Sequence, residues 1–165
     1  MSDPVRAAYS AGLAMLARRE LSEAQIRERL RRKDHDAGAV DRAVARLLEA
    51  GALNDRRVAV SAARTEAQVR SRGRAYVLRR LQAMGIAAEV SAGAVDEVFG
   101  ALDEPALLSR ALARRLRGPS APIQDAAHFR RLYQQLVRQG FSPSAVISAL
   151  EVRAKAGDMP EDEEL

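Results

Sequence analysis

The chain has 165 residues, and 27 Lys and Arg against 22 Asp and Glu give it a formal net charge of +5. Its 33 Ala and 18 Leu supply most of the apolar residues, whereas Thr occurs once and Ile four times. Ala, Leu and Arg favour helices, and β-branched residues favour strands. The composition therefore predicts an all-α protein and excludes a β-sandwich or barrel. Because Ala buries little apolar area, one thick core is not expected.

Several classes of site lack the residues they need. The chain has no Cys, and its two histidines, His35 and His128, lie far apart. Neither a glycine-rich phosphate-binding motif nor a nucleophile motif is present. We therefore expect no catalytic site, cofactor or metal. The polar start and the absence of any apolar run near 18 residues predict a cytoplasmic protein without membrane contact.

Helix signals divide the first half of the chain. Asp3 and Pro4 suit the cap and first position of a helix, Ser22 with Gln25 forms a capping box, and Gly51 suits a helix end. Asp55 is predicted to cap a helix that ends near residue 70, and Gly73 separates that helix from the next. The expected helices span residues 3–19, 22–33, 37–50, 55–70, 74–84 and 90–102.

Proline gives clearer signals in the second half. Pro105 suits the first turn of a helix with apolar positions Leu108, Leu112 and Leu116. Asp125 is predicted to cap the next helix, and Ser142 followed by proline opens the last. These helices are expected at residues 105–117, 125–139 and 143–156.

The same spacing of helix positions occurs three times. The matching sets are Ser22, Ile26, Leu30; Gly73, Val77, Leu81; and His128, Leu132, Leu136. Two copies also end alike, at Gly85-Ile86-Ala87 and Gly140-Phe141-Ser142. The repetition predicts three tandem three-helix units, residues 1–53, 54–103 and 104–156, arranged as an elongated, curved array. Residues 157–165 are predicted to be an acidic disordered tail, either solubilising or folded back over a basic patch.

The sign of the net charge alternates along the chain, and the basic residues are almost all arginine. Net charge is +8 over residues 1–80, −5 over 81–109, +6 over 110–140 and −4 thereafter, and Arg outnumbers Lys by 25 to two. Guanidinium groups suit phosphate or carboxylate, so we expect three clusters to bind DNA or a protein filament. They are Arg27, Arg31 and Arg32; Arg70, Arg72, Arg74, Arg79 and Arg80; and Arg110, Arg114, Arg115 and Arg117. For each single arginine, a solvated helix face is the alternative.

Gly73 and the tyrosines allow two further interpretations. Within the second cluster, Gly73 permits a tight turn and lets the backbone of a partner come close. Tyr9, Tyr76 and Tyr133 are either partly buried packing residues or platforms on which bases stack, and Tyr76 is the best placed for stacking.

Three segments are similar to the motifs of one known family. Residues 17–22 resemble an opening segment L-A-x-R-(E/D)-x-S, residues 44–59 resemble L-x-x-x-G-Y-L-D-D-x-x-F-A, and residues 73–86 resemble G-x-x-x-I-x-x-x-L-x-x-K-G-I. These motifs are those of the RecX recombination regulators. The match covers residues 8–86, and from there to residue 150 it depends on helix order and on Gly140-Phe141-Ser142.

The resemblance implies a non-enzymatic, monomeric modulator of homologous recombination, DNA repair and the SOS response. Such proteins bind along the groove of the RecA–DNA filament and inhibit ATPase activity and strand exchange. The main alternative is a free-standing helical module that binds DNA or RNA through its arginine clusters without RecA. A third is a helical-repeat scaffold for an unrelated protein, and an enzyme is the least supported.

Overall fold

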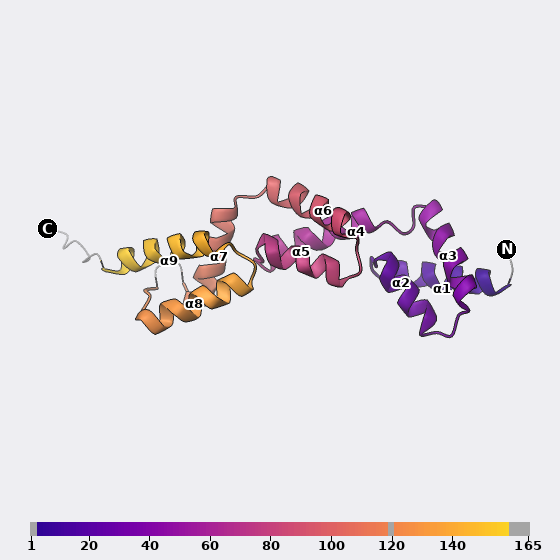
Figure 1. The fold of residues 1–165 in the computed structure, drawn as a ribbon, viewed down its shortest axis with the longest axis horizontal. Coiled ribbons are helices and arrows are strands. Elements are labelled where there is room, and N and C mark those ends of the chain that lie inside the picture. The colour runs from indigo at the N-terminus through magenta and orange to yellow at the C-terminus, as the bar shows by residue number, and fades with distance from the viewer. Residues whose placement is uncertain (1–2, 119–120, 159–165) are drawn as a thin grey trace. The chain divides into compact units, whose positions relative to one another are not determined.

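The chain folds into helices joined by short loops. A computed structural model describes residues 3–118 and 121–158, and no β-strand occurs in that part of the chain (Figure 1). The elements are α1 (Asp3–Leu16), α2 (Glu23–Arg31), α3 (Ala37–Glu49), α4 (Asp55–Arg64), the π-helical η1 (Thr65–Val69), α5 (Arg74–Ala83), α6 (Ala88–Gly100), α7 (Glu104–Leu116), α8 (Ala126–Arg138) and α9 (Pro143–Asp158). The predicted all-α fold of tandem helix trios is confirmed. Among the described residues, no helix combines the length and apolar character that a bilayer crossing requires.

Most helix starts follow the capping signals in the sequence. Both halves of the Ser22 and Gln25 capping box form at α2. The Asp125 carboxylate accepts a hydrogen bond of 2.6 Å from the backbone N–H of His128, and the Ser142 hydroxyl accepts one of 3.3 Å from Ala145. Capping is local chemistry, which is why these starts were predictable.

The start of α4 differs from the prediction. Asn54, rather than Asp55, caps this helix, because the Asn54 side chain accepts a 2.9 Å hydrogen bond from the backbone N–H of Arg57. The Asp55 carboxylate instead accepts a 2.7 Å hydrogen bond from the backbone N–H of Glu23, at the start of α2. Asp55 thus connects two helices, and its burial raises its pKa.

The helix predicted over residues 55–70 changes its winding after Arg64. The π-helical segment adds a residue to one turn and rotates the buried face. Val58, Ala59 and Ala63 are buried in α4, but Glu66 and Ala67 continue that face in η1, and Val69 is 66% exposed. Val69 therefore does not continue the apolar face of this helix.

The first three helices enclose a small apolar core. α1 packs on α2 and α3, and α2 on α3. The buried residues are Leu21, Ile26, Leu30, Val40, Val44, Leu47 and Leu53. Leu13 and Leu48 are 37% and 40% exposed, and Gly12 rather than Leu13 lies against the Leu47 side chain.

The backbone divides into two compact units. The first combines the chain up to Ala63 with Arg80–Asp96, and the second combines Arg64–Arg79 with the chain from Glu97 onward. In the first unit, the start of α2 contacts the turn between α5 and α6. The Ser22 hydroxyl donates a 2.5 Å hydrogen bond to the Met84 carbonyl, and a Cβ on Gly85 would collide with the Ala24 Cβ.

The second unit repeats this contact one trio later. The start of α5 contacts the turn between α8 and α9, where the Gly73 N–H donates to the Gln139 carbonyl at 2.8 Å and the Ala75 N–H to the Gly140 carbonyl at 3.2 Å. We call each such contact a joint: the second helix of one trio begins against the turn that follows the second helix of the next. The close approach expected at Gly73 is thus made by the chain itself.

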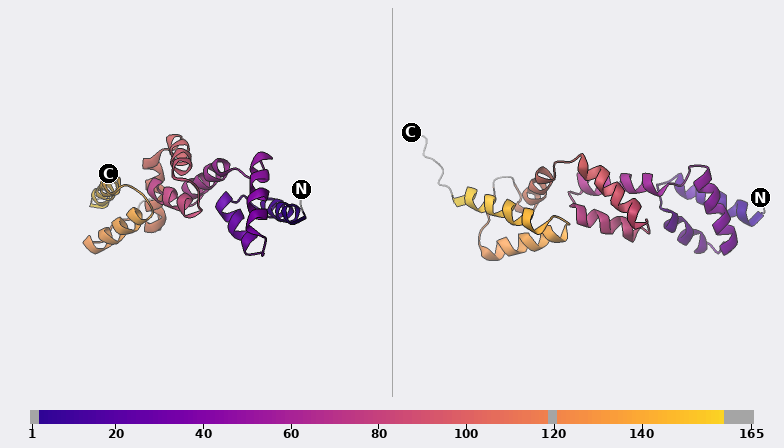
Figure 2. Two further views of the ribbon diagram at one scale, coloured as in Figure 1. Left: turned by 45° about the vertical axis from the view of Figure 1, so that its right-hand side comes forward. Right: turned by 45° about the horizontal axis from the view of Figure 1, so that its top comes forward.

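The last trio closes the second unit. α7, α8 and α9 pack on one another and lie side by side in the views of Figures 1 and 2. The predicted stripe of Leu108, Leu112 and Leu116 is buried. α9 continues to Asp158, past the end expected at residue 156, and the acidic residues 161–164 of the predicted tail lie outside the described residues.

Candidate nucleic-acid interface

Three arginines from separate elements of the second unit come together. Arg72 lies in the loop before α5, Arg115 near the end of α7 and Arg138 at the end of α8. Burial lowers the pKa of Arg115, and the nearby positive charges of Arg72 and Arg138 lower it further. In the described part of the chain, none of the three has a carboxylate partner. We call this group the central basic cluster.

Neighbouring polar groups hold the cluster in place. The Arg115 guanidinium donates a 2.9 Å hydrogen bond to the Gln135 side chain, and the Arg138 Nε donates one of 3.3 Å to the Gln134 carbonyl. The Arg72 guanidinium carbon lies 4.6 Å from the centre of the Tyr76 ring. Arg72 therefore covers one face of that ring, which leaves at most the other for a base to stack on.

Buried polar atoms without partners lie on the residues around the cluster. They are Arg72 Nε, Gln139 Oε1, Ser71 Oγ and Glu66 Oε2. Ser71 is 2% exposed and adopts a left-handed backbone conformation, with φ of 52°. Burying such groups costs free energy unless water or a ligand forms a hydrogen bond with them, so polar atoms lie beneath the surface around the cluster as well as on it.

The other arginines of the second predicted cluster differ in their surroundings. Arg70 pairs with Glu66 at 2.7 Å, and Arg74 pairs with Glu104 at 3.4 Å and lies 5.3 Å from the Phe99 ring centre. Arg79 and Arg80 are exposed on α5 and have no carboxylate partner within the described residues. The structure thus leaves Arg79 and Arg80 available to an external anion.

The third predicted cluster divides in the same way. Arg114 donates a 3.2 Å hydrogen bond to the Val69 carbonyl and so fastens α7 to the end of η1. Arg110 and Arg117 are exposed, without carboxylate partners in the described chain. Arg117 caps α7 in the left-handed conformation, with φ of 59°.

The first predicted cluster is largely paired. Arg27 forms ion pairs with Glu23, at 2.8 Å, and with Asp41, and the hydrogen bond to Glu23 is the main cause that raises its pKa. Arg32 pairs with Glu28 at 2.8 Å, whereas Arg31 is exposed and has no such partner among the described residues. Arg27 is therefore a structural residue first.

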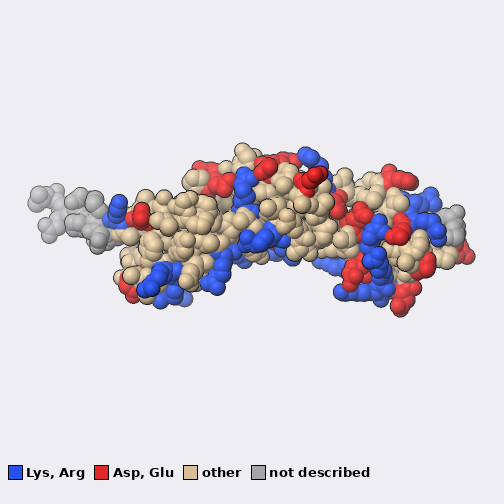
Figure 3. Space-filling model, viewed as in Figure 1, with Lys and Arg blue, Asp and Glu red and all other residues tan. Residues whose placement is uncertain are grey.

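A hollow beside this cluster was not predicted. It lies between the end of α1 and α2, has a volume of about 710 Å³, and is called the α1–α2 groove below. Its lining is Met15, Arg18, Arg19, Leu21, Gln25, Glu28, Arg29, Arg32 and Lys33. On the face shown in Figure 3, Lys and Arg atoms gather over α2. Of these cations, only Arg32 belonged to the predicted clusters.

Sequence reasoning also missed Arg138, and for a physical reason. Residues on one helix can be grouped by their spacing of three or four, but Arg115 and Arg138 lie on different helices. Their proximity depends on how α7 packs against α8. The net charge of +6 over residues 110–140 was the one available signal, and it does not say which arginines converge.

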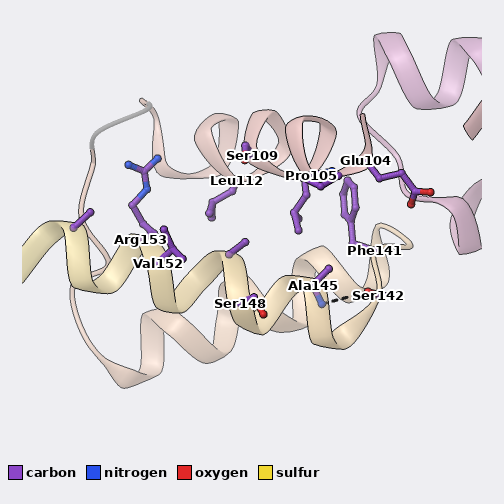
Figure 4. Close-up of a pocket in the computed structure, with 13 residues that line it drawn as sticks. Glu104, Pro105, Ser109, Leu112, Phe141, Ser142, Ala145, Ser148, Val152 and Arg153 are labelled. Atoms are coloured by element: carbon purple, nitrogen blue, oxygen red, sulfur yellow. Dashed lines mark hydrogen bonds between the residues drawn. The ribbon is translucent and has the colours of Figure 1, made fainter. Parts of the chain in front are cut away.

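A second hollow in the last trio has a different chemistry. It lies between α7 and α9, has a volume of about 490 Å³ and contains Leu112, Phe141 and Val152 (Figure 4). Val152 is 70% exposed, and Glu104 and Arg153 are the charged residues of the lining. Such an apolar surface does not suit phosphate groups. No group of three or more metal-binding side chains occurs in the described part of the chain.

Comparison with known proteins identifies the family. The first three-helix domain of RecX matches residues 8–47. Regulatory protein RecX of Syntrophotalea carbinolica is 32% identical over 143 residues, which cover 85% of this chain and 91% of that protein. RecX of Halorhodospira halophila is 32% identical over 159 residues, covering 96% and 91%. The chain belongs to the RecX family.

Solved structures agree with the fold. The crystal structure of RecX from Lactobacillus salivarius has a TM-score of 0.72 at 20% identity, covering 92% of this chain and 99% of that one. A second crystal structure of a regulatory protein RecX has a TM-score of 0.73 at 22% identity, covering 91% of this chain and 72% of that one. RecX relatives differ in length: this chain spans 59% of the Geobacillus kaustophilus protein, to which it is 29% identical.

Proposed function

We propose that this RecX-family protein modulates the RecA recombinase by binding along the RecA–DNA filament and inhibiting its ATPase activity and strand exchange. Family membership supports a RecA regulator. The observation that carries the DNA contact is the central basic cluster. Arg72 and Arg138 each repel Arg115, and among the described residues no carboxylate pairs with any of the three, so an anion that joins them relieves the repulsion.

The contact residues follow from which arginines are unpaired in the described chain. We assign the strongest phosphate contacts to Arg72, Arg115 and Arg138, with Arg79, Arg80, Arg110, Arg117 and Arg31 as further contacts. The paired arginines Arg27, Arg32, Arg70, Arg74 and Arg114 position their neighbours and contribute a weaker field. Distributed contacts of this kind add affinity without one deep pocket.

The organisation proposed for this function is a cytoplasmic monomer of three units, residues 1–53, 54–103 and 104–156. Each repeat of the joint lets a trio lean on the next, so that contacts can be spread over several RecA protomers. Inhibition is then steric, or the bound protein holds RecA protomers in one conformation. No catalytic step by the chain itself is required.

The decisive experiment is the single-stranded-DNA-dependent ATPase of RecA with added protein at low salt. We expect a dose-dependent loss of ATP hydrolysis and co-sedimentation of the protein with RecA–DNA filaments. An unchanged ATPase rate at micromolar protein contradicts the proposal.

A double variant tests the DNA contact within this function. Arg115→Gln with Arg138→Gln removes two charges that repel each other, so stability should stay the same or rise while inhibition weakens. Arg42→Gln with Arg46→Gln, two exposed arginines on α3, is the charge-matched control. If both pairs reduce inhibition equally, general charge and not the central basic cluster is responsible.

The alternative function, a nucleic-acid-binding module independent of RecA, is favoured by the same unpaired arginines. It predicts a steep salt dependence of binding to bare single strands with no effect on RecA beyond competition for DNA. Charge reversal at Arg79 and Arg80 should then abolish binding. Filament co-sedimentation far above that on naked DNA excludes this alternative.

A further inference from the structure

The α1–α2 groove concentrates positive charge that the described residues do not neutralise. Arg18 and Arg19 follow the end of α1, and Arg29 and Lys33 lie on and just after α2. Arg18, Arg19 and Lys33 are exposed, and Arg29 is half-buried. In the described chain, none of these four cations has a carboxylate partner. Glu28, the single acid of the lining, already pairs with Arg32 at 2.8 Å.

The groove combines apolar and amide surface with its charges. Met15 and Leu21 contribute apolar surface to it, Leu21 being 2% exposed, and Gln25 adds an amide. Gln25 is itself held in place, since its side chain accepts a 3.1 Å hydrogen bond from the Ser22 N–H. The cations come from both segments that border the groove, so an occupant that carries several anions in a row meets charge from both.

We propose that the α1–α2 groove is a second binding site for the phosphodiester backbone of a nucleic-acid strand. A strand carries one negative charge per nucleotide at regular spacing, and arginine contacts phosphate oxygens through two N–H groups at once. A protein surface usually mixes both signs of charge, so four unpaired cations in one groove match a strand better.

This site is separate from the central basic cluster and does not depend on RecA. It lies in the first compact unit, whereas the central basic cluster lies in the second. The test therefore uses bare DNA, so that failure of the RecA proposal and failure of this one give different results. The opposing view is a purely structural role, since basic side chains after the C-terminus of a helix stabilise the helix dipole.

The experiment measures binding of a fluorescent single-stranded oligonucleotide by anisotropy at several salt concentrations. We expect Arg18→Gln with Arg29→Gln to weaken binding about tenfold at low salt. The salt slope should also fall by about 0.7 for each phosphate that the variant no longer binds. The control is Arg42→Gln with Arg46→Gln, which makes the same charge change in the same unit and should leave the slope nearly unchanged.

Three results would overturn the proposal. Equal losses of affinity in the groove pair and the control pair would show that only net charge matters. Competition by polyglutamate as effective as by DNA of equal charge would assign the groove to an acidic protein segment instead. Circular dichroism and urea unfolding of both pairs report on folding, and a groove pair whose binding falls only as its helicity falls supports the structural role.

Discussion

At the scale of single residues, polar side chains near the joints act between trios as well as within helices. Ser22 completes the capping box of α2 and also donates to the Met84 carbonyl, although it is fully buried. Asp55 starts α4 and accepts from the backbone of α2. The local function of Ser22 was readable from the sequence, but the second partner of each residue lies far along the chain.

Asp55 makes stability depend on pH. Burial is the largest cause that raises its pKa, and repulsion by Glu23 adds to it, so ionisation of this carboxyl destabilises the folded state. The destabilisation is absent below the unfolded pKa near 3.8 and complete once pH exceeds the folded pKa. Asp55→Asn keeps the acceptor and should unfold at higher urea than wild type at pH 7. The difference should vanish near pH 3, and a constant difference contradicts this explanation.

At the scale of elements, the joint is the unit that repeats. The turns at Gly85 and Gly140 share positive φ and the same backbone hydrogen bond, from Ile86 to Leu81 and from Phe141 to Leu136. Ile86 and Phe141 are buried there, 3% and 7% exposed. The corresponding turn of the first trio has positive φ at Asp34, and the residue that follows is the polar His35.

A glycine pair tests the second joint. A Cβ on Gly140 would collide with the Tyr76 backbone nitrogen, and the φ of 94° disfavours any side chain. Gly140→Ala should cost about 3 kcal/mol of unfolding free energy. Gly93→Ala is the matched control, because nothing lies within 4 Å of its Cβ position in α6, and it should gain about 0.5–1 kcal/mol. Urea unfolding measures both changes. A Gly140→Ala variant with nearly the unfolding free energy of the wild type would show that the joint is loosely packed.

At the largest scale, the proposed DNA contact depends on charges that gather from several helices. The central basic cluster joins the loop before α5 with α7 and α8, and the α1–α2 groove joins two segments of the first unit. Each lies within a different compact unit. A DNA strand that contacts both sets would release counterions at both.

The two surfaces should therefore contribute independently to the salt dependence of DNA binding. The quadruple variant that combines Arg115→Gln, Arg138→Gln, Arg18→Gln and Arg29→Gln should lower the salt slope by the sum of the two double variants. Anisotropy titrations at four or more salt concentrations measure this. A quadruple variant no weaker than one of the doubles would show that one surface accounts for all of the binding.

Local sequence was enough to define the helices, most of their caps and the threefold repetition, because these depend on neighbours within about four residues. It also located the arginine-rich segments, including Arg72 and Arg115. The folded arrangement was needed to show that Gly73 meets Gly140 and that Arg138 completes a cluster. It was also needed to show that Arg27 has carboxylate partners, whereas Arg115 has none among the described residues. Those facts depend on distances between side chains that are remote in the chain, and helix packing alone sets such distances.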